Sequence, residues 1–529
     1  MGKITKYLNQ LITGNVFDAP SLLEEYSTDR SALKVRPKFI AFPESTEDVR
    51  KLMRFINQIA AKDIPASVTV WGSGLDEGGA DLSNSLIIST EKLNKLLEID
   101  PRERLVHVQA GITLKELNTA LSVSGLTIPI GGHDNETIGG LISNNPKDLY
   151  HAKYGGIGEF VERIEAILSN GECLQTERLK KYAVAKKAAD KTHEGEIYRK
   201  VSKLLKEKED FIERQGLNHK TMVGYPGIAK VKHRESVDLT PLFLGAQGTL
   251  GVITEVILRA IPMRKAPMRV VATFKELEPA LDYMAMVSEI NPREINVYDL
   301  RVLQDARETG KNLDGVIRRL EEGFVVFASF DERQSYCLRR IESFKHKLPR
   351  TAKFIVESAE TKKTLNEFEN SLASYLAQSK NGERIPILTD FYLPSGNIKS
   401  FLDDLKILGD KLKLDLALYG SYSTSIYNLR PKFKLDDPEL NKRLATFLRA
   451  GAYVIHRQGG ALAGGTPEGR LKAVVTNPDL LEPEKEIYDT IKGIFDSNNI
   501  LNPDAKLGAS SKFTLTHFRN TPLPKIPLQ

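Results

Sequence analysis

The chain has 529 residues, of which 41% are hydrophobic and 27% are charged, and its net charge is +6. This length is too great for a single hydrophobic core, so we expect two domains with additions, and the composition is ordinary for a soluble globular protein. Cys173 and Cys337 are the two cysteines, which excludes a disulfide framework and favours a reducing cytoplasm. The sequence shows neither a signal peptide nor a run of about 18 apolar residues, so we predict a cytoplasmic protein.

The first part of the chain predicts a helical lead-in over residues 1–34 and then a helix over residues 43–59. Ser45 can cap this second helix, and Val49, Leu52, Met53 and Ile56 recur at helical spacing. One face of the helix should therefore pack on a sheet.

A strand over residues 67–71 leads directly into a glycine-rich turn, WGSGLDEGG. Glycine lets consecutive backbone N–H groups turn toward a phosphate without steric cost. A P-loop is excluded because Ala80 and Asp81 follow Gly79 where Lys and Ser or Thr are needed, and Glu77 stands where the dinucleotide fingerprint needs its third glycine.

Further along, residues 86–89 and 104–109 predict strands, and residues 113–121 predict a helix with a capping box between Thr113 and Glu116. A second glycine turn, ETIGGLISNNP, follows. Two such turns in one half of the chain indicate one large phosphate-bearing ligand.

The order of these segments, completed by KYGGIGEFVERIEAILSNGE and LFLGAQGTLGVITEVILRAIP, resembles the FAD-binding domain of the vanillyl-alcohol oxidase and p-cresol methylhydroxylase (PCMH) superfamily, the FAD-linked oxidases. The resemblance covers residues from about Arg36 to Pro262. Within the superfamily the chain most resembles D-lactate and glycolate-type 2-hydroxyacid dehydrogenases, because NNILNPDAKLG, residues 498–508, is similar to that group's ending.

The resemblance implies an α+β fold with a two-subdomain PCMH-type FAD-binding domain and an α+β cap, or substrate, domain with an antiparallel sheet. We place the lead-in at residues 1–34, the FAD-binding domain at 35–262, the cap at 263–480, and a C-terminal helix and tail that return to the FAD-binding domain at 481–529.

The resemblance also implies which residues hold FAD. The pyrophosphate would lie on the first turn, and the ribityl chain and ring along the second. A Tyr-Gly pair and a strand that borders the adenosine complete the site. In this order, the residues are Gly72, Ser73, Gly74, Leu75, Asp76 and Gly79; Thr137, Gly139, Gly140 and Asn144; Tyr154 and Gly155; and Gly248, Gly251, Val252 and Ile253. The Asp76 carboxylate would repel a pyrophosphate unless it points away or caps a helix. No His or Cys matches a covalent flavin link, and His133 is interpreted as an exposed loop residue, so we predict non-covalent FAD.

The catalytic half departs from the relatives. Ser421 and Asn428 stand where the family's metal-binding histidines would be, and Gly465 and Thr466 replace its Glu-His pair, so no metal site is predicted. His456, Glu468, Tyr422 and Tyr427 are the candidate bases, although His456 lies in an apolar, strand-like run where a structural role is the alternative. Arg430, Arg470 and Lys472 are candidates for binding a substrate carboxylate.

The sequence thus predicts an FAD-linked oxidase or dehydrogenase that oxidises a CH–OH group, with a 2-hydroxyacid such as D-lactate or glycolate as the substrate and hydride transfer to flavin N5. The alternatives are a sugar or alditol oxidase or dehydrogenase, and a flavin-fold protein that has lost catalysis. The electron acceptor stays open between a quinone, an electron-transfer protein and oxygen. The basic stretch 178–208 indicates a solvated helix or, as the alternative, weak peripheral contact with the inner face of a membrane. No motif supports nucleic-acid binding.

Overall fold

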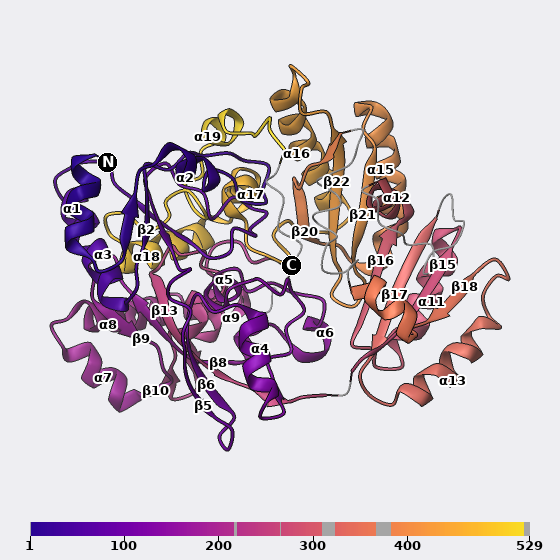
Figure 1. Cartoon of the computed structure of the whole chain (residues 1–529), viewed down its shortest axis with the longest axis horizontal. Coiled ribbons are helices and arrows are strands. Elements are labelled where there is room, and N and C mark those ends of the chain that lie inside the picture. The colour runs from indigo at the N-terminus through magenta and orange to yellow at the C-terminus, as the bar shows by residue number, and fades with distance from the viewer. Residues whose placement is uncertain (1, 216–219, 265, 309–322, 367–381, 523–529) are drawn as a thin grey trace.

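Three sheets organise the chain, two on the left of Figure 1 and one on the right. The computed structural model describes residues 2–215, 220–264, 266–308, 323–366 and 382–522. Parts of the predicted cap domain and the end of the predicted C-terminal tail lie outside these ranges.

The first sheet has four strands in the order β1-β2-β4-β3: Asn15–Phe17, Phe39–Phe42, Leu86–Ser89 and Val68–Trp71. β2, β4 and β3 are parallel, and β1 is antiparallel to β2. Helix α3, Thr46–Ala60, begins where the Ser45 hydroxyl accepts the Asp48 N–H, as predicted. Its residues Val49, Leu52, Met53 and Ile56 pack against β3 and β4, so the predicted buried face is confirmed.

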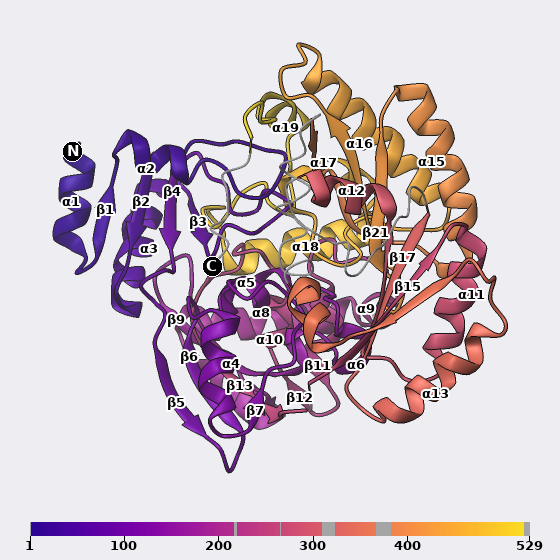
Figure 2. The ribbon, with the colours of Figure 1, turned by 45° about the vertical axis from the view of Figure 1, so that its right-hand side comes forward.

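The second sheet is antiparallel and has five strands in the order β5-β6-β13-β8-β9: Leu96–Asp100, Leu105–Gln109, Val252–Arg259, Val161–Ile167 and Cys173–Gln175. Helices α4 (Leu114–Ser122), α8 (His193–Glu207) and α18 (Glu482–Phe495) bury their apolar faces in the same core. The capping box of α4 between Thr113 and Glu116 is present as predicted. Figure 2 shows that α18, although late in the chain, lies beside α8.

The third sheet forms the cap and is antiparallel throughout. Its order is β18-β15-β17-β16-β21-β22-β19, with β20 also on β22: Lys353–Val356, Met268–Phe274, Phe324–Phe330, Glu294–Asp299, Leu416–Ser421, Ile426–Phe433, Glu383–Arg384 and Leu388–Tyr392. One face packs on α11 (Leu277–Ser288), α13 (Gln334–Lys345), α15 (Ile398–Leu412) and α16 (Leu440–Arg457). The other face carries α12 (Leu300–Glu308) and turns toward the glycine turns. The α+β fold with an antiparallel cap sheet is therefore confirmed.

The remaining elements are short. The helices are α1 (Lys3–Leu11), α2 (Pro20–Glu25), α5 (Ile138–Asn144), α6 (His151–Tyr154), α7 (Lys181–Ala189), α9 (Glu209–Gln215), α10 (Thr240–Phe243), α17 (Gly469–Thr476) and α19 (Ser511–Thr516). The strands are β7 (Leu126–Thr127) with β14 (Ile261–Pro262), and β10 (Leu179–Lys180), β12 (Ser236–Val237) and β11 (Lys232–His233). Across the parts of the chain that are described, no helix is long and apolar enough to cross a membrane.

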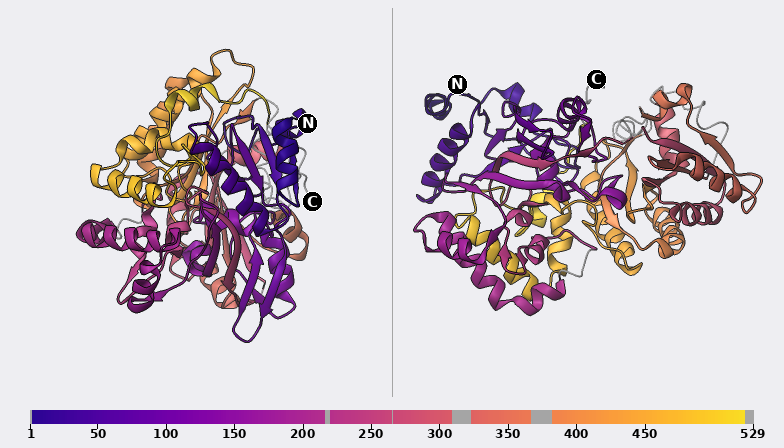
Figure 3. Two further views of the ribbon diagram at one scale, coloured as in Figure 1. Left: turned by 90° about the vertical axis from the view of Figure 1, so that its left-hand side faces the viewer. Right: turned by 90° about the horizontal axis from the view of Figure 1, so that it is seen from below.

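Figure 3 shows the two halves of the molecule side by side, and the segment just after α18 returns to the half that holds the first sheet. The Val68 N–H donates to the Ile500 carbonyl and the Asn502 N–H to the Val68 carbonyl, at 2.7 Å each, so residues 500–502 run next to β3. The strand-like interpretation of the run around His456 is wrong, because this run is the last turns of α16. Leu444, Phe447, Leu448 and Ile455 are buried at helical spacing, and this periodicity outweighs the local β-branched residues.

Candidate active site

A cavity of about 380 Å³ lies between the two glycine turns and the face of the cap sheet that is turned toward them. A smaller cavity of about 40 Å³ continues toward the second sheet, between Val70, Ala110, Gly248 and Gly251. Gly72, Asp81, Gly140 and Asn144 belong to the walls of both. The two cavities therefore adjoin at the point where the glycine turns meet.

The first glycine turn can approach the second only because it lacks side chains. A Cβ on Gly72 would lie 2.6 Å from the Thr137 hydroxyl oxygen, which is closer than real contacts allow. Gly74 has φ +67°, in the left-handed region that favours glycine. Thr137 in turn caps α5 by accepting the Gly140 N–H at 3.2 Å. The sequence thus brings two stretches of backbone together around one elongated space.

The Asp76 side chain folds back onto its own turn. Its Oδ2 accepts the N–H groups of Gly78 at 2.9 Å and Ala80 at 2.7 Å, and its Oδ1 accepts from Asn144 Nδ2 at 3.3 Å. Burial raises the pKa of Asp76. Burial, together with the neighbouring carboxylates Asp76 and Asp29, raises the pKa of Asp81 well above its usual range. A raised pKa favours the neutral form of a carboxyl, which repels a pyrophosphate less than the carboxylate does.

Arg470 fastens the first turn to the end of the chain. Its guanidinium donates to the carbonyls of Gly79 at 2.9 Å and Ala80 at 3.2 Å, and to Asn502 Oδ1 at 2.7 Å and the Pro503 carbonyl at 2.9 Å. Arg470 is buried and fully engaged by these groups. It is therefore a clamp on the turn, and it does not line the cavity.

On β16 and β22 the cap sheet presents alternate residues to the cavity, as the two-residue period of a strand requires. The residues of β16, β21 and β22 in the wall are Asn296 and Tyr298 of β16, Tyr419, Gly420 and Ser421 of β21, and Ile426, Asn428 and Arg430 of β22. Asn296 pairs with Ser421, and Tyr419 with Asn428, across neighbouring strands. The wall facing the glycine turns is thus mostly polar.

Asp390 is the carboxylate on β20 that reaches this cavity. It has φ +52°, and the pairing of β20 with β22 shifts register between Leu388 and Phe391, so a local irregularity directs the residue. Its Oδ2 accepts the Thr466 hydroxyl at 2.9 Å, and Lys472 Nζ donates to the Thr466 oxygen at 3.2 Å. Burial raises the pKa of Asp390, against the opposing effect of Lys472.

Two further carboxyls of the wall come from the second glycine turn and the loop after it. Burial raises the pKa of both Glu136 and Asp148 to about 7. Glu136 Oε2 and Asp148 Oδ2 have no hydrogen-bond partner within the described residues. Both groups can therefore exchange a proton, or accept a hydrogen bond, near neutral pH.

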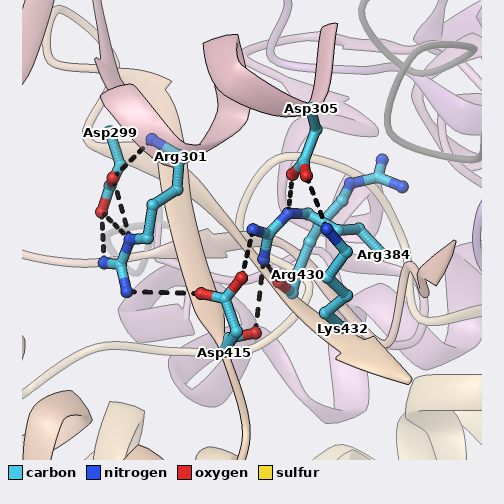
Figure 4. A network of polar contacts seen from close by, with 7 residues as sticks. All are labelled: Asp299, Arg301, Asp305, Arg384, Asp415, Arg430 and Lys432. Carbon is cyan, nitrogen blue, oxygen red and sulfur yellow. Dashed lines mark hydrogen bonds and ion pairs between the residues drawn. The ribbon is translucent and has the colours of Figure 1, made fainter. Parts of the chain in front are cut away.

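Arg430 reaches across the cavity from β22 to the first glycine turn. Its Nη2 forms an ion pair with Glu77, and its Nε donates to the Tyr419 hydroxyl at 2.8 Å. Arg384 fixes the backbone behind it, because Arg384 Nη1 donates to the Arg430 carbonyl at 3.2 Å. Figure 4 shows Arg384 held in turn between Asp305 and Asp415, with Lys432 also on Asp305.

The four residues proposed as bases do not line the cavity. His456 is on α16, where 43% of its side chain is exposed and its nearest acid is Asp479, 3.8 Å away. Glu468 is fully buried, accepting the Gly224 N–H at 2.9 Å and pairing with Lys506 at 2.9 Å. Tyr427 points into the helix-covered core, and Tyr422 follows the end of β21 and packs against the same core. All four therefore lie outside the cavity wall.

Of the residues proposed to bind a substrate carboxylate, Arg430 lines the cavity and Arg470 and Lys472 do not. Lys472 is buried next to it, on the Thr466 hydroxyl and the Thr389 carbonyl.

Most of the residues proposed to hold the cofactor line one or both cavities. These are Gly72, Ser73, Leu75, Asp76, Thr137, Gly139, Gly140, Asn144, Gly248, Gly251 and Ile253. The others support them from outside: Gly74, Gly79, Tyr154, Gly155 and Val252. Gly79 packs on Leu33, and the Tyr154 hydroxyl bonds to Asp331 of the cap. His133, expected to be exposed, lies in the cavity wall, and burial lowers its pKa.

The sequence analysis missed Asp390, Glu136 and Asp148 as members of the site. Asp390 lies in the segment PILTDFYLP, where a single charged residue within an apolar run was the available signal. Ser421, Asn428, Gly465 and Thr466, the positions that depart from the family's ligands, all line the cavity. Within the described ranges, no three His, Cys, Asp or Glu side chains are grouped so that they could hold a metal ion.

Comparison with known proteins agrees with this geometry. The family described as FAD binding domain matches residues 37–177, and the family described as FAD linked oxidases, C-terminal domain, matches residues 264–505. A D-2-hydroxyglutarate dehydrogenase of Pantoea ananatis is 24% identical over 90% of this chain and 48% of its own length. A D-lactate dehydrogenase of Archaeoglobus fulgidus is 23% identical over 91% of this chain and 95% of its own.

The chain therefore spans about half the length of the D-2-hydroxyglutarate dehydrogenase that it matches. Among solved structures, a 4-ethylphenol oxidase from Gulosibacter chungangensis has a TM-score of 0.68 at 15% identity, covering 96% of this chain and 97% of that one. This likeness confirms the PCMH-type fold.

The residues present fit FAD. The glycine turns can enclose an elongated space because their backbones lie close to their neighbours: a Cβ at Gly72 would collide with the Thr137 hydroxyl, and one at Gly139 with Ala110. The Asp76 carboxylate is turned into its own loop. The cofactor's phosphates would lie at the first turn, and the ring system would face the polar wall of the cap. With both halves matched by their families, the chain belongs to the FAD-linked oxidases.

Proposed function

We propose that this chain is an FAD-dependent dehydrogenase that oxidises the CH–OH carbon of a small hydroxylated molecule. FAD, when bound, supplies the acceptor for the hydride that leaves this carbon. The remaining requirement is a group that takes the hydroxyl proton, and such a group contributes typically about 10²- to 10⁴-fold to the rate.

The position of the Asp390 carboxylate is the observation on which this proposal rests. It lies in the cavity wall where the cap faces the glycine turns, its pKa is raised by burial, and Thr466 holds one carboxylate oxygen at 2.9 Å. Lys472 keeps the Thr466 hydroxyl oriented. The Asp390 carboxylate would accept the substrate's hydroxyl proton as the hydride leaves carbon, which leaves a carbonyl product.

The relatives are named D-2-hydroxyglutarate and D-lactate dehydrogenases, which makes 2-hydroxyacids the first substrate class to test, with glycolate added from the sequence-based prediction. One observation favours sugars or alditols as a second class: unpaired oxygens of carboxyl, amide and hydroxyl groups line the cavity. Loss of catalysis is the third candidate, and a buried carboxylate that is held in the cavity by Thr466 speaks against it.

The test begins with the visible spectrum of the purified chain and of the supernatant after denaturation. Release of the flavin would support non-covalent FAD. Anaerobic bleaching of the flavin by members of either substrate class would then support the dehydrogenase.

We expect Asp390→Asn to keep the flavin spectrum and to slow bleaching at least about 100-fold, because the amide cannot take the proton. Asp403→Asn, on the exposed side of α15, is the matched control and should bleach at the wild-type rate. An Asp390→Asn protein that is reduced as fast as the wild type contradicts the role of Asp390. Absence of bleaching by any alcohol or acid contradicts the dehydrogenase itself.

The electron acceptor and the location in the cell stay proposals. On α8, the basic residues Lys200 and Lys203 form ion pairs with Glu196 at 2.6 Å and Glu207 at 3.7 Å, which favours a solvated helix over a membrane contact. Sedimentation with anionic vesicles would test the membrane contact. Re-oxidation of the reduced flavin by a quinone, an electron-transfer protein or oxygen would identify the acceptor.

A further inference from the structure

Arg430 is positioned to recognise an anion in the cavity, but it is already neutralised. Arg430 lines the cavity wall, the residue is 3% exposed, and its guanidinium forms an ion pair with the Glu77 carboxylate. The Tyr419 hydroxyl accepts from its Nε at 2.8 Å. A carboxylate of the chain itself thus occupies the face of Arg430 that a substrate carboxylate would need, since Arg pairs with carboxylates through this planar fork.

The rest of the wall is acidic. Among the described residues its carboxyls are Asp76, Glu77, Asp81, Glu136, Asp148 and Asp390, and its basic side chains are Arg30, Lys147, Arg430 and His133. Burial lowers the pKa of both Lys147 and His133, and Arg30 already interacts with the Glu77 charge. A carboxylate moved from water into this wall would lose its hydration beside more carboxyls than basic side chains.

The same wall offers acceptors that have no donor. Asn296 Oδ1 and Ser421 Oγ are buried and without a hydrogen-bond partner in the described chain, and so is Asp148 Oδ2. Asn296 and Ser421 face each other across β16 and β21. Buried polar atoms almost always have partners. The hydroxyl groups of a ligand would supply these, because each hydroxyl can donate to one such oxygen and accept from another group.

We propose that Glu77 is a specificity-determining residue, which masks Arg430 so that the cavity takes an uncharged, hydroxyl-rich molecule of the sugar or alditol class and rejects carboxylates. This inference rests on the proposed oxidation of a CH–OH carbon, and it selects between the two substrate classes. Glu77 acts through Arg430 and has no part in the proton transfer.

The test compares matched pairs of probes that differ in one group: glycerol with glycerate, xylitol with xylonate, and sorbitol with gluconate. Binding to the FAD-loaded chain is measured by calorimetry under anaerobic conditions, and bleaching of the flavin is recorded separately. In the wild type we expect at least one alditol to bind about tenfold or more tightly than its acid partner. Binding of an acid as tightly as its alditol, or of none of the alditols, overturns the proposal.

Glu77→Gln uncovers Arg430 and should improve binding of the acids by about tenfold or more, with little change for the alditols. Glu439→Gln is the matched control, because it removes an exposed glutamate that pairs with Lys442 at 3.3 Å. The double variant Glu77→Gln/Arg430→Gln removes both charges and should not gain acid binding. If the double variant gains acid binding as strongly as Glu77→Gln does, the negative charge of the wall excludes acids, and not the masking of Arg430. The proposal is then wrong.

The double variant also covers the case in which Glu77→Gln alone does not fold, because it leaves no unpaired guanidinium. A gain of acid binding by the double variant, with alditol binding kept, would then overturn the masking, because no guanidinium is left at position 430 to hold the acid. Binding of an alditol without bleaching would leave this inference standing while the dehydrogenase fails. Bleaching by acids alone would support the dehydrogenase and overturn this inference.

Discussion

Asp29 is an acid buried beneath the first glycine turn, with 1% of its surface exposed. Its Oδ1 accepts the Ser31 N–H at 2.9 Å, and its Oδ2 has no partner among the described residues. Burial, with the Asp76 charge added, raises the pKa of Asp29 from 3.8 to about 8. The folded chain therefore binds a proton here that the unfolded chain releases, and stability falls as the pH rises from about 4 toward 8.

We expect Asp29→Asn to flatten this fall, with a gain on the order of a few kcal/mol at pH 8 and little change at pH 4. The thermal midpoint measured between pH 4 and pH 9 checks it. Asp18→Asn should have the opposite pH dependence. Hydrogen bonds from Thr5 and Gly2 lower the pKa of Asp18, so the substitution should reduce stability at high pH and leave it unchanged at low pH. A parallel pH profile for Asp29→Asn and the wild type would contradict the prediction.

At this scale, more of the residues proposed for the cofactor than of those proposed for catalysis line the cavities. The glycine turns can be recognised in the sequence because no other residue tolerates positions such as Gly72 and Gly74. Tyr427 and Asn428 are neighbours on β22, yet one enters the core and the other the cavity, and which face is which depends on the packing of the helices. The raised pKa of Asp390 follows from burial, which appears only once the cap is folded over the turns.

Among the elements, α17 matters because it carries Arg470 to the first glycine turn. Replacing Arg470 with Met keeps its bulk but leaves the Gly79, Ala80 and Pro503 carbonyls without this donor. We expect a loss of roughly 3 kcal/mol or more in the free energy of unfolding, since buried hydrogen bonds to a charged group are lost, and weaker FAD binding as the turn loosens.

Urea unfolding and FAD titration measure both effects of Arg470→Met. Arg457→Met is the control, because Arg457 is 51% exposed on α16 and pairs with Asp404 at the surface. Its cost should stay below about 1 kcal/mol. Equal losses for the two variants would show that the clamp on the turn has no special weight.

The elements themselves were largely predictable. Helices α3 and α4 have their caps in the sequence, and the strands before and after the first turn alternate or are wholly apolar as expected. The run at the end of α16 was misread because Val454 and Ile455 suggest a strand over a short window, while the helix is set by spacing over its 18 residues. Pairing between β3 and residues 500–502 could not be predicted, because the partners are far apart in sequence.

For the whole molecule, contacts between distant parts of the chain hold the halves together. Lys153 and Tyr154 of α6 bond to Asp331 at the end of β17, and Arg519 pairs with Glu383 of the cap. Lys506 and Glu468, both fully buried, pair at 2.9 Å. The Lys506 ammonium also lies 5.8 Å from the centre of the Tyr225 ring. Each contact joins segments that are separate in the sequence.

Lys506→Met should cost about 3–5 kcal/mol of stability, because it leaves the Glu468 carboxylate buried without its cation. Adding Glu468→Gln should recover most of this loss, since the amide oxygen can still accept the Gly224 N–H. Unfolding in urea compares the two proteins. A double variant as unstable as the single one would show that Lys506 acts through packing and not through charge.

Asn502 completes the hydrogen bonds around the first glycine turn, although it is synthesised much later than that turn. Its side chain donates to the carbonyls of Ala80 at 2.9 Å and Gln247 at 2.7 Å, and it accepts from the Thr69 hydroxyl and from Arg470. During synthesis, β3 and the turn after it leave the ribosome some 430 residues before Asn502 does, a gap set by the sequence positions of Thr69 and Asn502. The contacts that complete the first glycine turn therefore form only after Asn502 has been synthesised, and until then the nascent chain has an incomplete flavin pocket.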